Sequence, residues 1–278
     1  MKKLLARVLA LCCALLLLVP ALPAAAEENG FSILLIGLDD GSDDNSEYGR
    51  ADAMIIATLS SSGVRLVSID RDLCVVLPEE YGIAAGETKL CITAYFGGPE
   101  MTLRYVNDAL GLSIPYYAAI DKPGVVKLIN AVGGLTLEID DDDLAVKEVK
   151  KLFKSKGSKT LKGKSVLNYI GARTMDSTGD IDRNRRQRKV LAAAFEKARG
   201  MDFGQLAEAA GALMEVTQTN LDLAGLMSVA SQAMSGVDSV RESRYPQTFQ
   251  RKTLNLHSVV LPTDVEAERA QVHAFLYE

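Results

Sequence analysis

Aspartates and arginines lie at the ends of three apolar runs of the chain, where they could form one chemical site. Asp39 ends the first run, Asp52 introduces the second, and Arg71 follows the third. Short β-branched runs of this kind predict strands, and ligands of open α/β sheets bind outside the carboxyl ends of the strands. Oxygen ligands without His or Cys suit Mg²⁺, which usually binds through one or two carboxylates together with substrate phosphate. The pattern therefore predicts a metal-assisted phosphate site.

A second set of charges lies in the segment from Arg183 to Lys189, which holds five cations in a chain of formal net charge −5. A net-acidic chain is a poor general nucleic-acid binder, because phosphate affinity needs a broad basic footprint. The apolar residues that follow the segment recur at helical spacing and define a buried face. Extending the same helical spacing from these apolar residues back toward Arg183 divides the segment into one inward-facing set and one solvent-facing set. The inward set is Arg183, Arg186 and Gln187, and the solvent-facing set is Arg185, Arg188 and Lys189.

The inward set occupies the predicted first turns of the helix, where Asp182 can cap and the free N–H groups favour an anion. A guanidinium matches a phosphate or a carboxylate in geometry. Two interpretations of this stretch stay open: a phosphate clamp, or internal salt bridges to Asp176 or Asp180. The acidic run Asp140–Asp143 is interpreted as a solvated turn.

The first 26 residues have the layout of a secretory signal peptide, with a basic head, an apolar run and the small-residue site Ala24-Ala25-Ala26. The alternative is an uncleaved anchor, because the apolar stretch nearly reaches the ~20 residues that a membrane span requires. Both interpretations place residues 27–278 outside the cytoplasm, in the cell wall or at the outer face of the cytoplasmic membrane. There Cys74 and Cys91 could form a disulfide, or remain thiols if the exterior is anaerobic.

Residues 27–278 are predicted to form a single α/β domain, because strand and helix patterns are mixed along the chain and no linker interrupts them. The predicted strands are 32–38, 53–60, 64–69, 116–120 and 135–139, followed near the end by an edge strand over 253–261. The predicted helices are 99–110, 123–132, 162–170, 183–199, 203–217 and 223–234, with a closing helix over 265–276.

These motifs resemble the LytR-CpsA-Psr (LCP) family of bacterial cell envelopes. The resemblance runs in order, over roughly residues 31–200, through ILLIGLDD, GRADAMIIATLS, VRLVSIDRD, KLCITAYFGG, YYAAIDKPGVVKLINAVGGLTLEI, LKGKSVLNYIGAR and GDIDRNRRQRKVL. It implies a three-layer α/β/α fold with a central mixed sheet. It also implies an extracytoplasmic phosphotransferase, acting at the membrane surface, that moves a teichoic-acid or capsular type of glycopolymer from undecaprenyl pyrophosphate to peptidoglycan.

The resemblance also implies roles for individual residues. Asp39 and Asp52 match the family's metal-associated aspartates, with Mg²⁺ as the ion, and Arg71 matches a catalytic arginine that engages the pyrophosphate. Further pyrophosphate contacts fall on Arg173, Arg183 and Gln187, and Arg186 lies in the same signature with a weaker claim. Asp52 is also a candidate catalytic base for the acceptor hydroxyl. Its structural alternative is an ion pair with Arg50 or Arg71.

Four positions depart from the family pattern. Gly41 and Gly171 stand where arginines are frequent, Cys91 replaces a common asparagine, and Asp70 replaces a frequent proline. Each lost charge-assisted contact to a pyrophosphate would cost ~1.5–3 kcal/mol. Two other functions therefore stay open: a homologue that binds lipid-linked glycan or wall polymer without transferring it, and a hydrolase that uses water as the acceptor.

Overall fold

The computed structural model describes residues 30–39, 48–60, 63–81, 86–172, 179–222, 225, 239–254 and 257–278. A six-stranded sheet of order β10-β3-β2-β1-β6-β9 runs through its centre. These strands are β1 (Phe31–Leu38), β2 (Ala51–Ser60), β3 (Gly63–Ile69), β6 (Tyr116–Ile120), β9 (Thr217–Thr219) and β10 (Val240–Tyr245). The strand β1 is antiparallel to β2 and parallel to β6, and β10 is parallel to β3, so the expected mixed sheet is confirmed.

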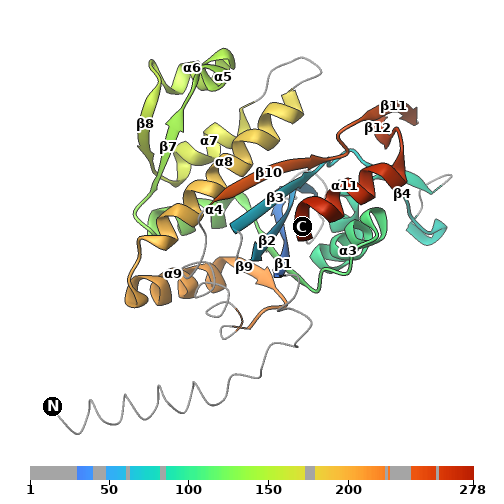
Figure 1. Cartoon of the computed structure of the whole chain (residues 1–278), viewed down its shortest axis with the longest axis horizontal. Coiled ribbons are helices and arrows are strands. Elements are labelled where there is room, and N and C mark those ends of the chain that lie inside the picture. The colour runs from blue at the N-terminus through green and yellow to red at the C-terminus, as the bar shows by residue number, and fades with distance from the viewer. Residues whose placement is uncertain are drawn as a thin grey trace, which may run out of the picture.

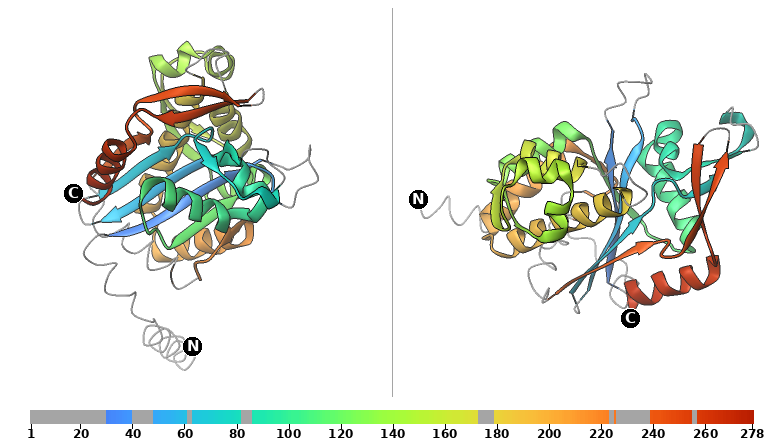
Figure 2. Two further views of the ribbon diagram at one scale, coloured as in Figure 1. Left: turned by 90° about the vertical axis from the view of Figure 1, so that its right-hand side faces the viewer. Right: turned by 90° about the horizontal axis from the view of Figure 1, so that it is seen from above.

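Helices cover both faces of this sheet, which explains why β2 and β3 are buried along most of their length rather than at alternate residues. One face packs against α3 (Thr93–Leu110) and α11 (Val265–Tyr277). The opposite side carries α4 (Lys122–Ala131), α7 (Gly163–Gly171), α8 (Gly179–Arg199) and α9 (Phe203–Val216). Seen from above in Figure 2, the sheet stands on edge between these two helical layers, which confirms the three-layer arrangement.

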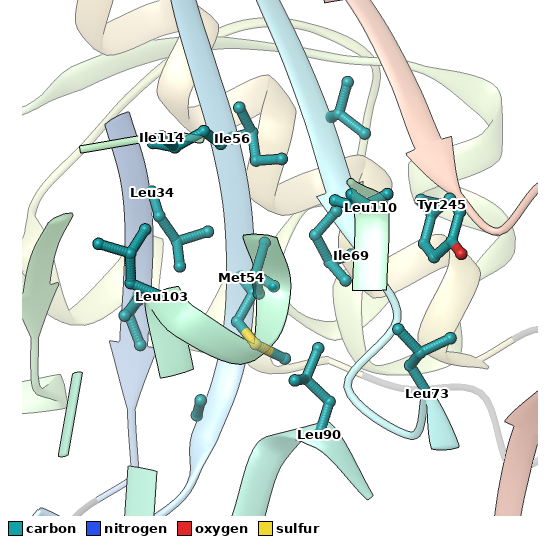
Figure 3. Packing of buried hydrophobic residues seen from close by; sticks show 14 of the residues in the cluster. Leu34, Met54, Ile56, Ile69, Leu73, Leu90, Leu103, Leu110, Ile114 and Tyr245 are labelled. Atoms are coloured by element: carbon teal, nitrogen blue, oxygen red, sulfur yellow. The ribbon is translucent and has the colours of Figure 1, made fainter. Parts of the chain in front are cut away.

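The larger core lies between the sheet and α3. Leu34, Met54 and Ile56 point from the sheet toward Leu103 and Leu110 of α3 (Figure 3). Burying a side chain of this size contributes about 1.5–3 kcal/mol. On the other face Ile33, Ile55 and Leu66 pack against Leu191 and Phe195 of α8. Alternate residues of each strand thus hold helices on opposite faces.

A smaller unit stands beside α8 and has its own core (Figure 1). It consists of the hairpin β7 (Leu135–Ile139) and β8 (Gly157–Leu161) with α5 (Asp141–Ala145) and α6 (Lys147–Leu152). Val149 and Val166 are buried in this core, and Val190 of α8 joins it. The unit is therefore packed onto the helix that carries the cationic segment.

Most predicted elements are confirmed, one C-terminal strand differs, and one C-terminal helix is not tested. The stretch 253–261 is not an edge strand of the main sheet but belongs to a separate hairpin of β11 (Phe249–Leu254) and β12 (His257–Pro262). The main sheet has two edge strands, and neither was predicted. In β10 the four central residues are Arg241, Glu242, Ser243 and Arg244, and β9 is only 3 residues long. Most of the predicted helix 223–234 lies outside the described residues.

Two short strands, β4 (Cys74–Val76) and β5 (Glu87–Lys89), form a small sheet after β3. The short helices η1 (Glu79–Tyr81) and η2 (Leu90–Ile92) flank β5. None of the helices in the described ranges is long and apolar enough to cross a membrane. The predicted signal peptide or anchor, residues 1–26, falls before the first described residue.

Candidate active site

Asp39 lies immediately beyond the carboxyl end of β1. Its backbone N–H donates to the carbonyl of Arg50 over 2.9 Å, and its Oδ1 accepts from the backbone N–H of Arg50 over 2.7 Å. This two-way contact extends the β1–β2 pairing by one residue and fixes the carboxylate at the sheet edge.

Asp52 sits in a β-bulge of β2. Gly37 pairs with Ala53 and Leu38 pairs with Ala51, so Asp52 is the extra residue in the β2 strand. A bulge leaves the extra residue outside the ladder and re-aims its side chain. The carbonyl of Asp52 accepts from Nη2 of Arg183 over 3.2 Å, and its carboxylate accepts from Nη1 of Arg71.

Arg71 lies in the turn that follows β3, and this turn is held on several sides. The Oδ1 of Asp70 accepts from the backbone N–H of Asp72 over 2.9 Å. The backbone N–H of Cys91 donates to the carbonyl of Arg71, and that of Val260 in β12 donates to the carbonyl of Asp72. The Arg71 side chain is therefore presented from a braced backbone.

The charges around Arg71 alternate. Its guanidinium meets Asp52, while its Nε lies 3.6 Å from Oδ1 of Asp72, which is 2.9 Å from Nζ of Lys89. The side chains of Arg71 and Asp52 are 18% and 31% exposed, so the pair stays within reach of solvent and of a ligand. Both interpretations of Asp52 are compatible with this geometry, because a carboxylate has a second oxygen beyond the one that meets Arg71.

Cys74 and Cys91 are both free thiols. Cys74 stands opposite Lys89 in the β4–β5 ladder, and Cys91 comes two residues after Lys89. Burial raises the pKa of the Cys91 thiol to about 11, with smaller effects from Arg71, Asp72 and Lys89. Of the two alternatives left by the sequence, the structure has the thiols, and Cys91 braces the Arg71 turn through its backbone.

The inward face of α8 divides into two parts. Arg183 is 3% exposed and reaches Asp52, as described above. Gln187 follows one turn later on the same face, and among the described residues its buried Oε1 has no hydrogen-bond partner. The helix begins at Gly179, so Asp182 lies inside it and the expectation that Asp182 caps it is wrong.

Arg186 points to α7 rather than to Asp52. Its side chain is fully buried, its Nε donates to the carbonyl of Tyr169 over 3.1 Å, and its Nη2 donates to the carbonyl of Ala172. Burial lowers the pKa of this guanidinium. These contacts satisfy carbonyls at the end of α7 that have no partner within the helix.

The solvent-facing assignment of the other three cations is wrong. The solvated turn at Asp140–Asp143 is right only for the exposed Asp141 and Asp142, because Asp140 and Asp143 bind these cations. Arg185 donates to Asp140 and Asp143 over 3.1 and 2.9 Å, and Nζ of Lys189 donates to the same two carboxylates over 2.8 and 2.6 Å. Asp140 caps α5 in a capping box with Asp143, which is fully buried and also accepts from the hydroxyl of Tyr169. The two segments bind each other.

Arg188 is buried on the sheet side of α8. Its Nε donates to Glu242 of β10 over 2.9 Å and its Nη1 donates to Ser68 of β3 over 2.8 Å. It thus fastens the charged edge strand β10 that the sequence did not reveal.

The structure therefore brings Asp52, Arg71 and Arg183 into contact and holds Asp39 at the adjacent strand end. Arg173 lies outside the described residues. Within the described ranges, no group of three or more His, Cys, Asp or Glu residues gathers to hold a metal. Asp39 and Asp52 still fit Mg²⁺, because that ion commonly takes only one or two protein carboxylates and completes its shell with water and substrate phosphate.

Comparison with known proteins identifies the relatives of this chain. TagU of Enterococcus faecalis, a polyisoprenyl-teichoic acid–peptidoglycan teichoic acid transferase, is 30% identical over 227 residues, which are 78% of this chain and 70% of TagU. Biofilm regulatory protein A of Streptococcus mutans is 29% identical over 261 residues, which are 88% of this chain and 63% of that protein. The chain thus spans only part of the length of these curated relatives.

The fold of TagT, solved bound to LIIa-WTA, superposes with a TM-score of 0.71 at 21% identity, covering 93% of this chain and 94% of TagT. The LytR_cpsA_psr family model matches residues 19–272. That range contains Asp39, Asp52, Arg71 and the cationic part of α8. The chain therefore belongs to the LytR-CpsA-Psr family.

Proposed function

We propose that this chain is an extracytoplasmic phosphotransferase that moves a glycopolymer of teichoic-acid or capsular type from a polyprenyl-pyrophosphate carrier to peptidoglycan. One observation carries the proposal: Arg71, from the turn after β3, and Arg183, from α8, both reach Asp52 at a partly exposed bulge. Membership of a family in which TagU is named a teichoic acid–peptidoglycan transferase supports it.

In the proposed reaction, an acceptor sugar hydroxyl attacks the phosphorus atom that bears the glycan. The bond from that phosphorus to the bridging oxygen breaks, and polyprenyl phosphate leaves with the electron pair. The hydroxyl proton passes to Asp52, whose carboxylate lies at the same bulge as the cations. The product is a phosphodiester between glycopolymer and peptidoglycan.

The cations of the site stabilise the charge that moves onto the leaving phosphate. Arg71 and Arg183 provide guanidinium groups on a braced turn and on a packed helix, so little reorganisation accompanies the reaction. Gln187, one turn from Arg183, can donate a neutral hydrogen bond to the pyrophosphate. Arg173 belongs to the proposed clamp from the family motif. We assign Arg186 to the support of α7 rather than to direct phosphate contact.

Asp39 would hold Mg²⁺ as the main ligand and Asp52 only weakly, so that Asp52 stays available as the base. The ion would supply further positive charge to the pyrophosphate as a Lewis acid. The Oδ1 of Asp39 accepts from the backbone N–H of Arg50, which holds this carboxylate at the sheet edge beside Asp52. The proposed place of action is the outer face of the cytoplasmic membrane or the cell wall, where the lipid-linked donor meets peptidoglycan.

The test is transfer from a synthetic polyprenyl-pyrophosphate glycan to a peptidoglycan oligomer, using the full chain in detergent with Mg²⁺. We expect a ligated product and released polyprenyl phosphate, both lost in Arg71→Ala. The matched control is Arg199→Ala, which removes an exposed arginine that pairs only with Glu196 on the same helix. Release of glycan phosphate without ligation would make the protein a hydrolase. Donor binding without either product would make it a binding protein.

A further inference from the structure

A cavity of about 300 Å³ opens beside Asp39, at the carboxyl ends of the parallel neighbours β1 and β6. Its volume is at the lower end of the range of small-molecule sites. The edge of the sheet at which it lies is where α/β folds bind ligands. Its polar lining consists of Asp39, Asp121 and Gln218, and its other walls are formed by Tyr48, Pro123 and Val216.

The polar groups stand on rigid elements. Asp121 caps α4, with Oδ1 accepting from the backbone N–H of Gly124 over 2.7 Å. Gly124 allows this close turn, because a Cβ there would lie 2.8 Å from Ile120 and 3.0 Å from the carbonyl of Val216. Gln218 is exposed and stands opposite Ala119 in the β6–β9 ladder. These side chains therefore converge from a helix terminus and a strand.

Tyr48 forms an aromatic wall. Its ring lies against Gly98, where an added Cβ would be 3.2 Å from the ring. Gly98 has a φ of +67° and forms the kink of α3, so the ring packs on bare backbone. The cavity thus combines carboxylates and an amide with one aromatic face.

The chemistry of this lining selects a neutral polyol. Two carboxylates repel a phosphate, so the pyrophosphate belongs on the Arg71 and Arg183 side of Asp52 rather than here. Hydroxyl groups can donate to both carboxylates and exchange hydrogen bonds with the amide of Gln218. The apolar C–H face of a sugar ring can pack against the ring of Tyr48 and the apolar residues of the lining.

We propose that this cavity binds one pyranose ring of the reacting glycans, with Asp39 at the boundary between sugar and phosphate. The inference rests on the proposed function for the identity of the glycans, and it adds a sugar subsite to the phosphate site. The ring could belong to the donor polymer or to the peptidoglycan acceptor. The two sources share the same chemistry.

Two variants test the cavity without removing its scaffold. Asp121→Asn keeps a side-chain oxygen that can cap α4 and removes the negative charge, and Gln218→Leu removes the amide at an exposed strand position. Each has a matched control. Asp264→Asn makes the same change at the cap of α11, where Asp264 accepts from the N–H of Ala267, and Gln250→Leu makes the same change on the exposed strand β11.

Affinity is measured by calorimetry on the full chain with two probes. One is the peptidoglycan disaccharide N-acetylglucosaminyl-N-acetylmuramic acid with its lactyl carboxyl converted to the amide, so that the sugar is neutral, and the other is polyprenyl pyrophosphate carrying one N-acetylglucosamine. We expect each cavity variant to weaken one probe about three- to tenfold, which corresponds to one lost hydrogen bond, and the controls to stay within about twofold. Weakening of the disaccharide identifies the acceptor sugar. Weakening of the lipid-linked probe alone identifies the donor sugar.

The proposal is overturned if wild-type protein binds neither probe. It is also overturned if both affinities survive in the folded Asp121→Asn/Gln218→Leu double variant. Failure of the proposed function would give a different result: one probe binds through the cavity, but no phosphodiester forms. Conversely, if ligation requires Arg71 but proceeds unchanged in the double variant, the sugar subsite is ruled out and the proposed phosphotransferase activity stands.

Discussion

Two arginine–aspartate clusters involve the cationic part of α8, and they differ in the burial of the carboxylate at their centre. The first, called the enclosed cluster after its buried Asp143, also contains Asp140, which is partly exposed. In the first, Arg185 and Lys189 meet Asp140 and Asp143, and Asp143 has no exposed surface. In the second, Arg71 and Arg183 meet Asp52, whose side chain is 31% exposed at the sheet edge. We infer that the first cluster holds the fold together and that the second is open to a ligand. The same residue types therefore acquire different roles through burial.

The largest expected effect is on stability and comes from the enclosed cluster. Asp143→Ala would leave Arg185, Lys189 and the hydroxyl of Tyr169 without their shared buried partner. Breaking a buried ion pair in this way costs about 3–5 kcal/mol. The free energy of unfolding from urea titration measures the loss. Asp141→Ala is the control, because Asp141 pairs with Lys156 in solvent and such pairs contribute about 0–1 kcal/mol. Equal losses in the two variants would contradict the enclosed role of Asp143.

The next effect is on activity and comes from the open cluster. Arg183→Ala should lower the rate of glycopolymer transfer about 10²–10³-fold, because removing one preorganised donor from a developing anion has effects of this size. Arg185→Ala, two residues along the same helix, should lower stability while the folded protein keeps its rate. The measurement is the transfer rate per folded molecule, with folding checked by circular dichroism. If both variants lose the same activity, the division of α8 into two clusters is wrong.

A smaller loss of stability is expected when the hydroxyl of Tyr169 is removed and its ring is kept. The hydroxyl donates to Asp143 over 2.8 Å, while the ring packs edge-on to Phe153. Burial and the neighbouring Asp143 raise the pKa of Tyr169, so the phenol stays protonated and remains a donor at neutral pH. Tyr169→Phe keeps the packing and should cost about 1.5–3 kcal/mol, the range for a hydrogen bond to a charged group. Chemical denaturation tests this, and an unchanged midpoint would show that Arg185 and Lys189 already satisfy Asp143.

The comparison also shows what the sequence could and could not predict. The central strands and α3, α4, α7 and α9 follow from apolar patterning, because each pattern is local. The enclosed cluster could not be predicted in that way, since its partners are 42 to 49 residues apart and each charged segment alone resembles a solvated one. A helical projection based on the apolar face of α8 cannot show that the unit of β7, β8, α5 and α6 packs against another side of the helix.

The candidate site was predicted in its residue types but not in its geometry. Asp39, Asp52 and Arg71 were found because they lie at the ends of predicted strands. The bulge at Asp52 could not be predicted, because it depends on the register of β2 with β1. Arg186 was grouped with Arg183 by spacing alone, yet it bonds to α7. The cavity beside Asp39 was missed because Asp121 and Gln218 line it together only when β9 pairs with β6. Asp121 itself, an aspartate just before a predicted helix, has the sequence pattern of a helix cap and carries no separate signal of a ligand.

The smallest expected effect is a pH dependence of stability that originates in the enclosed cluster. Burial alone would raise the pKa of Asp140, but the hydrogen bonds from Lys189 and from the N–H of Asp143, with the charge of Arg185, lower it overall. A carboxyl whose pKa is lower in the folded state stabilises the fold fully above its unfolded pKa of about 3.9. That contribution is lost as the pH falls through the lower folded value.

The Asp140→Asn variant isolates this contribution, because asparagine can still cap α5 but does not titrate. The difference in free energy of unfolding between wild type and variant should be largest at pH 5–7 and should shrink progressively below about pH 4. Urea titrations at a series of pH values provide the measurement. Asp264→Asn, at the cap of a helix remote from Arg185 and Lys189, is the control for the amide itself. A wild-type advantage that persists unchanged into strong acid would mean that Asp140 acts through capping alone, and the enclosed cluster would then depend on Asp143.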